Sequence, residues 1–155
     1  DMAIKLESAQ LLLYRAASNA DKGLPSAYET AVAKAACNQA GFEVAHEAVQ
    51  IMGAAGYSKS SLVEYCMRRC RGWMIAGGSI EMLKNRIAEH VLETLRGQGV
   101  RAHHVEGLAA GRWVLLDFVD FVVHVFQPAL REFYQLEKLW RGEASSADAP
   151  VVLEP

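Results

Sequence analysis

Hydrophobic residues recur at helical spacing through the first two thirds of the chain. Within residues 1–20 they form one stripe, at Leu6, Ala9, Leu13, Ala16 and Ala20. Steps of three and four between apolar positions are typical of a helix with one buried face. Residues 21–25 contain Gly and Pro and break this pattern, and Ser26 with Glu29 three residues later predicts a capping box. A second helix is therefore expected from residue 26 onward.

The second helix is expected to be long. Apolar residues continue at helical spacing until Gly53 and Gly56, which predict its end. A helix of roughly 27 residues would be about 40 Å long, and such a helix following another favours an antiparallel bundle. Residues 57–78 are expected to form a loop and a short helix. Ser79 then predicts the cap of a third helix over residues 79–96. Its apolar stripe consists of Leu83, Ile87, Val91 and Leu95.

Beyond Gly99 the helical spacing gives way to short β-branched or aromatic runs. Three runs, residues 100–106, 112–117 and 121–126, are separated by turn signals, and the last two are close enough to form a hairpin. Pro128 suits the first position of a terminal helix. The apolar face of that helix would consist of Leu130, Phe133, Leu136, Leu139 and Trp140. The pattern predicts an α+β fold: an N-terminal antiparallel helical bundle segment, then a small, mainly antiparallel sheet with a terminal helix.

The composition is that of a globular protein. Hydrophobic residues make up 52% and charged residues 22% of the 155 positions, and the net charge is −2. These values, with no apolar run of membrane-spanning length, argue against a direct nucleic-acid binder and against a membrane protein. Cys37, Cys66 and Cys70 are an odd number at no zinc-binding spacing, so reduced, packing thiols in a cytoplasmic protein are expected. Because it starts with Asp1, the chain is expected to begin within a longer sequence, and residues 142–155 are expected to form a disordered tail.

The first ninety residues carry a specific resemblance to one family. The segments that carry it are residues 1–9, 14–17, 33–35, 48–57, 63–68, 75–79 and 86–89. In order and spacing they resemble the C-terminal domain of acyl-CoA dehydrogenases, flavoenzymes that take a proton and a hydride from adjacent carbons of an acyl thioester. The resemblance implies a helical bundle that completes an FAD site and an oligomer interface.

This resemblance implies roles for four residues. Gln50 and Gly53 would approach the dinucleotide part of the FAD of a neighbouring subunit, and Gly78 and Ser79 would lie near the flavin. Glycines there would let backbone amides approach a phosphate or a ring. Gly77 stands where many members carry the glutamate base, and the family's N-terminal helical and middle β-domains have no counterpart. The resemblance therefore implies no catalytic residue and no FAD bound by the chain alone, with helix ends and packing as the alternative role of the four residues.

The last part of the chain resembles a second family. The segments are Gly107 and residues 111–117, 120–126 and 131–140, preceded by residues 87–91, 99–100 and 105–107. They resemble ribosomal silencing factors, which are not enzymes. That family binds the large ribosomal subunit at protein L14 and blocks joining of the small subunit, so the resemblance implies translation repression. The family's opening strands and helix have no counterpart in residues 1–80, so the remaining strands would leave at least one sheet edge bare.

Three residues of the second strand are the candidate partner-binding residues. Trp113, Leu115 and Asp117 point to one side of the strand by alternation, and a polar-aromatic face suits a protein partner. The alternative is that Trp113 and Leu115 belong to the core. His124 lies between valines with no carboxylate or cysteine motif around it, so a packed histidine is expected rather than a metal ligand. Val119 stands where silencing factors usually have glycine, so either a strained turn or a wider loop is expected.

The two resemblances meet inside one helix. Residues 1–90 resemble the dehydrogenase domain, residues 87–141 resemble the silencing factor, and residues 87–92 suit both. A junction without a linker, inside a helix, favours a composite chain over a fusion of whole domains; recombination, chimeric assembly and deliberate design are all open. We expect the 79–96 helix to run unbroken and the two halves to pack as separate layers. We further expect no catalytic activity from the chain alone. L14 binding is the best surviving activity, and the alternative is a dehydrogenase fragment that contributes to a flavin site and self-associates through its helical segment.

Overall fold

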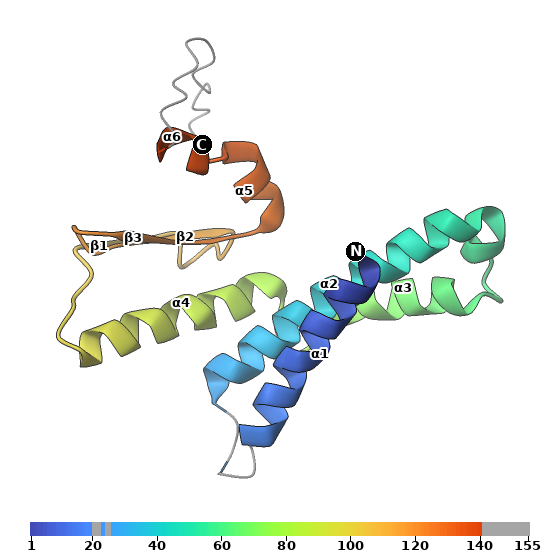
Figure 1. Cartoon of the computed structure of the whole chain (residues 1–155), viewed down its shortest axis with the longest axis horizontal. Helices are drawn as coiled ribbons and strands as arrows, with labels where there is room; N and C mark the ends of the chain where they lie inside the picture. Colours follow the sequence, from blue (N-terminus) through green and yellow to red (C-terminus); the bar gives the residue numbers. More distant parts are fainter. Residues whose placement is uncertain (20–22, 24–25, 141–155) are drawn as a thin grey trace.

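The computed structural model describes residues 1–19, 23 and 26–140, and the described residues form an α+β fold (Figure 1). The helices of the first part are α1 (Met2–Asn19), α2 (Ala27–Tyr57), α3 (Leu62–Trp73) and α4 (Ile80–Gly97). The later elements are β1 (His104–Glu106), β2 (Trp113–Asp117), β3 (Val122–Phe126), α5 (Pro128–Tyr134) and α6 (Glu137–Trp140). The fold class expected from the sequence is confirmed. The expected tail and most of the expected break at 21–25 lie outside the described residues.

The start of α2 is capped as the sequence predicts, but only on one side of the expected box. The Ser26 hydroxyl accepts a hydrogen bond of 3.0 Å from the Glu29 amide. The Glu29 carboxylate instead accepts a bond of 2.5 Å from Asn19 Nδ2, at the end of α1. The reciprocal half of the box is therefore replaced by a bond between two helices. This bond and the Lys5–Glu43 ion pair of 2.5 Å hold α1 against α2.

Gly53 interrupts α2, and the helix then resumes for one turn and ends at Tyr57, directly after Gly56, so the two glycines mark its end as the sequence predicts. Gly53 has φ 58° and ψ −138°, a conformation open to glycine and strained for other residues. Gly56 is buried in the continuing turn, where an added Cβ would lie 2.7 Å from Met52 Cβ. A glycine can therefore interrupt a helix without ending it when the following residues still have helical neighbours.

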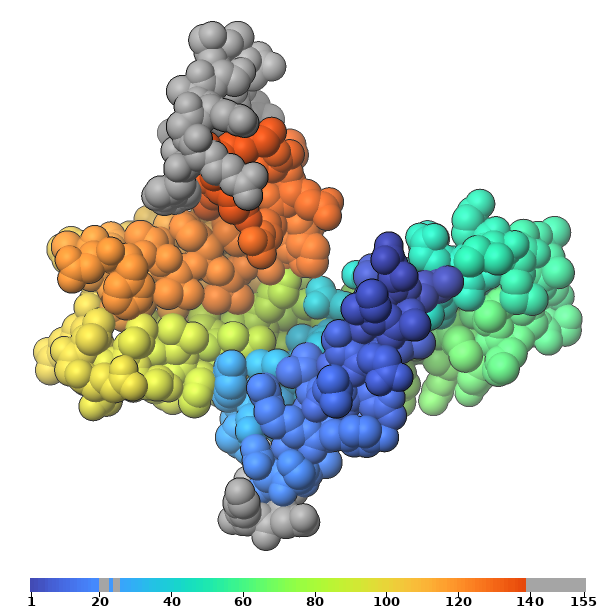
Figure 2. All heavy atoms as spheres, viewed as in Figure 1, coloured from blue at the N-terminus to red at the C-terminus, as the bar shows by residue number. Residues whose placement is uncertain are grey.

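Two hydrophobic cores share the single helix α4. The first core joins α2 to the start of α4 and consists of Ala31, Ala35, Ile80 and Leu83, with Met74 and Ile87 against it. The second core joins the rest of α4 to the sheet, and its fully enclosed residues are Ala88, Val114, Leu116 and Phe118. Helix α4 runs without a break from Ile80 to Gly97. Both the unbroken helix and the separate packing of the two halves, predicted from the sequence, are thus confirmed (Figures 1 and 2).

The sheet has the order β1-β2-β3, and both pairs are antiparallel. Val114 and Leu116 of β2 are completely buried against α4. By alternation Trp113, Leu115 and Asp117 lie on the opposite face, and each of them is half-buried. Helices α5 and α6 lie on that opposite side, so the sheet is the middle layer of this half (Figure 1).

The expectation of one terminal helix over residues 128–140 is wrong. Pro128 occupies its first turn as predicted, but Gln135 adopts a left-handed conformation, with φ 44° and ψ 47°, and separates α5 from α6. The break brings Glu137 back to Arg131, with 2.6 Å between Oε1 and Nε. It also ends α5 at Tyr134, whose ring lies 5.1 Å from that of Trp113. These two contacts accompany the break in the helix, and the spacing of apolar residues along the chain does not predict them.

Replacing Val119 with glycine is expected to stabilise the protein by about 1 kcal/mol. Val119 has φ 71° in the turn between β2 and β3, so the strained turn, one of the two expected outcomes, is confirmed. A non-glycine residue in left-handed geometry costs roughly 1–2 kcal/mol, and the greater freedom of glycine in the unfolded chain offsets part of the gain. Thermal unfolding of the two proteins side by side measures the difference. Val119→Ala, which keeps a Cβ at the same φ, should gain clearly less, and an unchanged or lower midpoint for Val119→Gly would contradict the prediction.

Candidate functional site

The four candidate cofactor residues lie in two separate places. Gln50 and Gly53 are exposed near the end of α2. Gly78 and Ser79 precede α4 and lie beside the first third of α2, where Lys34 Nζ donates a hydrogen bond of 3.1 Å to the Gly78 carbonyl. Lys34 and Gln50 are more than four turns apart on α2, so the two places are separated by ~24 Å. The chain alone does not bring the four residues together.

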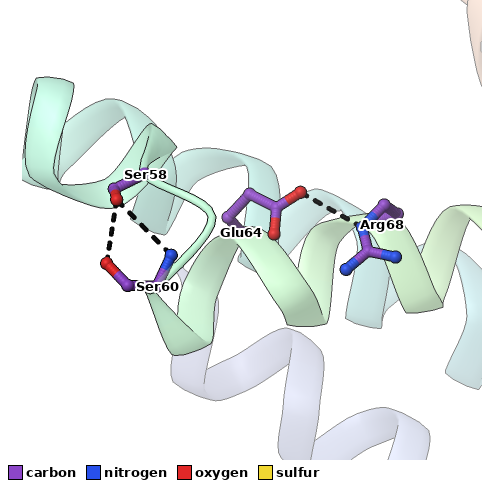
Figure 3. Close-up of polar contacts among 4 residues, drawn as sticks. All are labelled: Ser58, Ser60, Glu64 and Arg68. Carbon is purple, nitrogen blue, oxygen red and sulfur yellow. Dashed lines mark hydrogen bonds and ion pairs between the residues drawn. The ribbon is translucent and has the colours of Figure 1, made fainter.

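The place around Gly53 is followed along the chain by a group of polar contacts between the end of α2 and the start of α3 (Figure 3). Beyond α2, the Ser58 and Ser60 hydroxyls lie 2.9 Å apart, and the Ser60 amide donates a bond of 3.4 Å to Ser58 Oγ. One turn into α3, Arg68 Nε donates a bond of 3.2 Å to Glu64 Oε1. Among the described residues Glu64 Oε2 is buried without a hydrogen-bond partner. No added Cβ at Gly53 would meet an atom within 4 Å, so its backbone is open to an approaching group.

The place around Gly78 is a loop fixed from α2. Lys34 Nζ also donates a bond of 2.8 Å to the Ala76 carbonyl, and Ser79 Oγ accepts a bond of 3.4 Å from the Met82 amide at the start of α4. Gly77 has φ 69° and Gly78 has φ 101°. A side chain at position 77 would carry the cost of left-handed geometry, roughly 1–2 kcal/mol, with only the Lys34 side chain nearby.

The face of the sheet turned away from α4, here called the outer sheet face, carries all three candidate partner-binding residues. The pairing of the strands shows which residues lie on this face, because residues paired across antiparallel strands share a face. The residues of the outer sheet face are His104, Glu106, Trp113, Leu115, Asp117, Val122, His124 and Phe126. It is a mixed surface of aromatic, apolar and charged side chains, as the alternation in β2 predicts.

Trp113 anchors an aromatic cluster at one end of the outer sheet face. Its ring lies 4.8 Å from that of Phe126 and 5.1 Å from that of Tyr134, and its Nε1 donates a bond of 3.1 Å to His124 Nδ1. Burial lowers the pKa of His124, so the ring is neutral at pH 7 and accepts this bond. His124 is a packed histidine, as expected, and Trp113 is half-buried among Phe126, Tyr134 and His124.

Leu115 and Asp117 lie further along the outer sheet face, and Leu115 borders the Trp113 cluster through His124. Leu115 pairs with Glu106 on one side and His124 on the other. Asp117 pairs with His104 and Val122, and its Oδ1 accepts a bond of 2.8 Å from the Val119 amide. Asp117 therefore has a structural role in the turn. Leu115, half-buried with no such role, is the cleaner candidate for partner contact.

A cavity of about 400 Å³ lies between the two halves, in a place that the sequence did not indicate. Its lining comes from α2, from the end of α3 and its connection to α4, and from the starts of α4 and α5. One wall is Glu81, whose carboxylate accepts a bond of 2.5 Å from Gln127 Nε2. Hydrogen bonds from its own backbone amide and from the Ser79 hydroxyl lower the pKa of Glu81.

Lys84, one turn further along α4, is another polar link between the halves, beside the Asn85 amide that donates a bond of 2.6 Å to the Leu108 carbonyl. It is only 7% exposed, and its Nζ donates a bond of 2.6 Å to the Phe126 carbonyl. Burial lowers the pKa of Lys84 to about 8, although the nearby Glu81 carboxylate opposes the shift. No motif in the sequence could have singled out this lysine, since it directly follows the apolar Leu83 on an amphipathic helix.

The described residues offer no metal site, since no group of three His, Cys, Asp or Glu side chains gathers in them. Cys37, Cys66 and Cys70 are free thiols, and burial raises the pKa of Cys37 and Cys70. Cys70 Sγ would lie 3.2 Å from a Cβ at Gly41, so it fills the contact between α2 and α3, as expected of a packing cysteine. Within the same part of the chain, no helix is long and apolar enough to cross a membrane.

Comparison with known proteins finds one relationship for the first part of the chain. The family model of the acyl-CoA dehydrogenase C-terminal domain matches residues 1–92. The mitochondrial short-chain specific acyl-CoA dehydrogenase of Bos taurus is 40% identical over 96 residues, which cover 62% of this chain and 23% of that protein. A crystal structure of an acyl-CoA dehydrogenase from Slackia heliotrinireducens superposes with a TM-score of 0.57 and 32% identity, covering 61% of this chain and 25% of that one. The chain thus spans about a quarter of these relatives.

A second relationship concerns the later part. The ribosomal silencing factor RsfS of Zymomonas mobilis is 31% identical over 105 residues, which cover 68% of this chain and 73% of that protein. The lengths matched by this factor and by the dehydrogenase domain together exceed the length of the chain. The two regions of similarity therefore overlap by about 40 residues or more, which is longer than the 18 residues of α4.

Proposed function

The chain belongs to the acyl-CoA dehydrogenase family through residues 1–92 and to the ribosomal silencing factor family through its later part, and from this double membership we propose that it acts by binding large-subunit ribosomal protein L14. In this proposal the sheet half carries the activity, and bound L14 can no longer take part in joining of the small subunit. The helical half is a dehydrogenase segment without its own catalytic base.

The observation that carries the proposal is an outer sheet face that survives the joining of the two halves. Its supporting core is complete on the α4 side, where Val114 and Leu116 are fully buried. The helical half packs on α4 through Ile80 and Leu83, away from the sheet. On the outer sheet face His104, Glu106 and Val122 are exposed, and Leu115 and Asp117 are half-buried. A rigid sheet that presents Leu115 between polar neighbours resembles the apolar centre and polar rim of a protein interface.

Binding to purified L14 tests the proposal, with Leu115→Lys as the diagnostic variant. Titration calorimetry should give a saturable complex for the wild-type chain and an affinity at least about tenfold weaker for Leu115→Lys, because a charge would replace an apolar contact at the centre of the face. Leu62→Lys makes the same change at a residue of α3 that is 74% exposed, so its affinity should equal that of the wild type. Absence of a wild-type complex, or equal loss in both variants, would contradict the proposal.

A second candidate function is a contribution to the flavin site of a dehydrogenase partner. Gln50 and the open backbone of Gly53 favour it, since both are exposed at the end of α2 where a neighbouring subunit could place its FAD. The chain alone is expected to purify without stoichiometric FAD and to show no dye-linked oxidation of acyl-CoA, because Gly77 offers no base. Flavin absorbance and the dye assay measure both, and a yellow, active preparation would contradict this expectation.

We place the boundary between the two parts within residues 87–92, in the middle of α4. In this interval Ile87 still packs on the first core and Ala88 already belongs to the second. Amplification from source DNA across codons 80–100 tests whether the junction is physically continuous. A product of the expected sequence supports one continuous gene, whereas two separate products would assign the junction to sequence assembly.

A further inference from the structure

The outer edge of β3 is an unpaired strand edge with a definite pattern of donors and acceptors. Hydrogen bonds from Phe118 N to Phe121 O and from Gln127 N to Arg112 O, both at 2.9–3.0 Å, close the β2–β3 ladder at its two ends. In an antiparallel ladder the backbone groups of alternate residues point the same way. The amides and carbonyls of Val122, His124 and Phe126 therefore point away from β2 and out of the sheet.

This edge lacks the features that usually protect an exposed strand. Of its outward backbone groups, only the Phe126 carbonyl has a partner among the described residues, the Lys84 ammonium. β3 contains five residues with no charge, proline or glycine, and Val122 is 44% exposed. The opposite edge, β1, has only three residues and carries the His104–Glu106 pair at 2.8 Å. Short, charged edges resist further pairing, whereas an edge such as that of β3 is a template for another strand.

We propose that two copies of this chain associate edge to edge through β3, pairing antiparallel about a two-fold axis at His124. The strand is complementary to itself in this register. His124 exchanges two backbone hydrogen bonds with His124 of the second copy, and Val122 does the same with Phe126 of that copy. Each outward donor then meets an outward acceptor, and a carbonyl has lone pairs for both Lys84 and the new amide.

The side chains agree with the same register on both faces. On the outer sheet face Val122 lies opposite Phe126 of the second copy, a β-branched and aromatic pair that stabilises antiparallel strands. On the other face Val123 lies opposite Val125 of the second copy, and both already pack on the second core. The two cores would merge into one beneath a continuous sheet. A slip of one residue would place apolar residues of one copy opposite the wrong face of the other, so only registers that differ by two residues keep the faces matched.

Sedimentation velocity of the full chain over a wide concentration range tests the proposal, with two lysine variants in the same row of the sheet. Val122 and His104 both pair across β2 through Asp117, one at each edge. The wild type should show a monomer–dimer equilibrium. Val122→Lys should weaken it about tenfold or more, because the two-fold axis makes each substitution act twice, and His104→Lys should leave it unchanged. Circular dichroism confirms that both variants fold.

Hydrogen exchange provides the second measurement. The amides of Val122 and His124 should gain protection as the concentration rises, because only pairing at this edge engages them. A monomer at every concentration, equal weakening by both lysines, or a dimer without this protection overturns the proposal. The last result would place self-association elsewhere, for example on the exposed Leu6 and Leu13 of α1.

Discussion

Replacing Gly107 with alanine is expected to destabilise the protein by about 3 kcal/mol or more. Gly107 follows β1 with φ +80°, and an added Cβ would lie 1.9 Å from the carbonyl oxygen of Trp113. The obstacle is backbone, held between β1 and β3, so no side-chain rotation can relieve it. Strain at a left-handed residue costs ~1–3 kcal/mol, and overpacking adds a similar amount. Against a typical stability of about 5–15 kcal/mol, the sheet half would be close to unfolding.

Alanine substitutions at two other glycines, Gly99 and Gly97, distinguish the cost of the left-handed backbone from the cost of the steric clash. Gly99 has φ +85° but open space where its Cβ would be, so alanine there should lose only the conformational part. Gly97 ends α4 with neither a positive φ nor a nearby atom, so alanine there should be neutral or slightly stabilising. Urea unfolding followed by circular dichroism ranks the three variants. Equal losses at Gly107 and Gly99 would mean that the close approach to Trp113 does not exist in solution.

The stability of the protein is expected to rise between about pH 8 and pH 10.5 through Lys84. The pKa of this group is about 8 in the folded chain, against its ordinary value of 10.5 in the unfolded chain. Below pH 8 both states carry the proton, and the penalty of the buried charge is fully present. Between the two values the unfolded chain binds more protons, so the free energy of unfolding increases with pH. At 1.36 kcal/mol per pKa unit, the increase is at most about 3 kcal/mol.

The comparison with Lys84→Met isolates this contribution. Cys37 and Cys70, whose pKa values are raised by burial, lose protons in the same pH range and act in the opposite direction, but they are present in both proteins. The difference in unfolding free energy, wild type minus variant, should therefore rise from pH 8 to pH 10.5. Denaturant titrations at several pH values measure it. A difference that stays constant over this range would show that the Lys84 ammonium is solvated in the folded protein.

The sequence by itself determined the class of the protein and the identity of its two parts. Helical spacing, Ser26, Ser79 and Pro128 located helix starts correctly, because caps act within one turn and depend on few neighbours. The positive φ at Val119 was also predictable, since a tight turn between strands restricts φ whatever the side chain. Alternation in β2 correctly placed Trp113, Leu115 and Asp117 on one face, but left open whether that face was the core.

Only the tertiary structure decided how the two parts share α4 and what their contacts do. The stripe Leu83, Ile87, Val91 and Leu95 read as one face, yet its first two residues pack on the helical half and its last two on the sheet. The helical half and the sheet pack on α4 from different directions, and the spacing of apolar residues along the helix does not reveal this. The break at Gln135 and the buried ammonium of Lys84 likewise depend on Trp113 and Phe126, which lie far along the chain. Local sequence signals determine where helices and strands begin. Burial and long-range contacts determine which side chains, such as Lys84, have a shifted pKa.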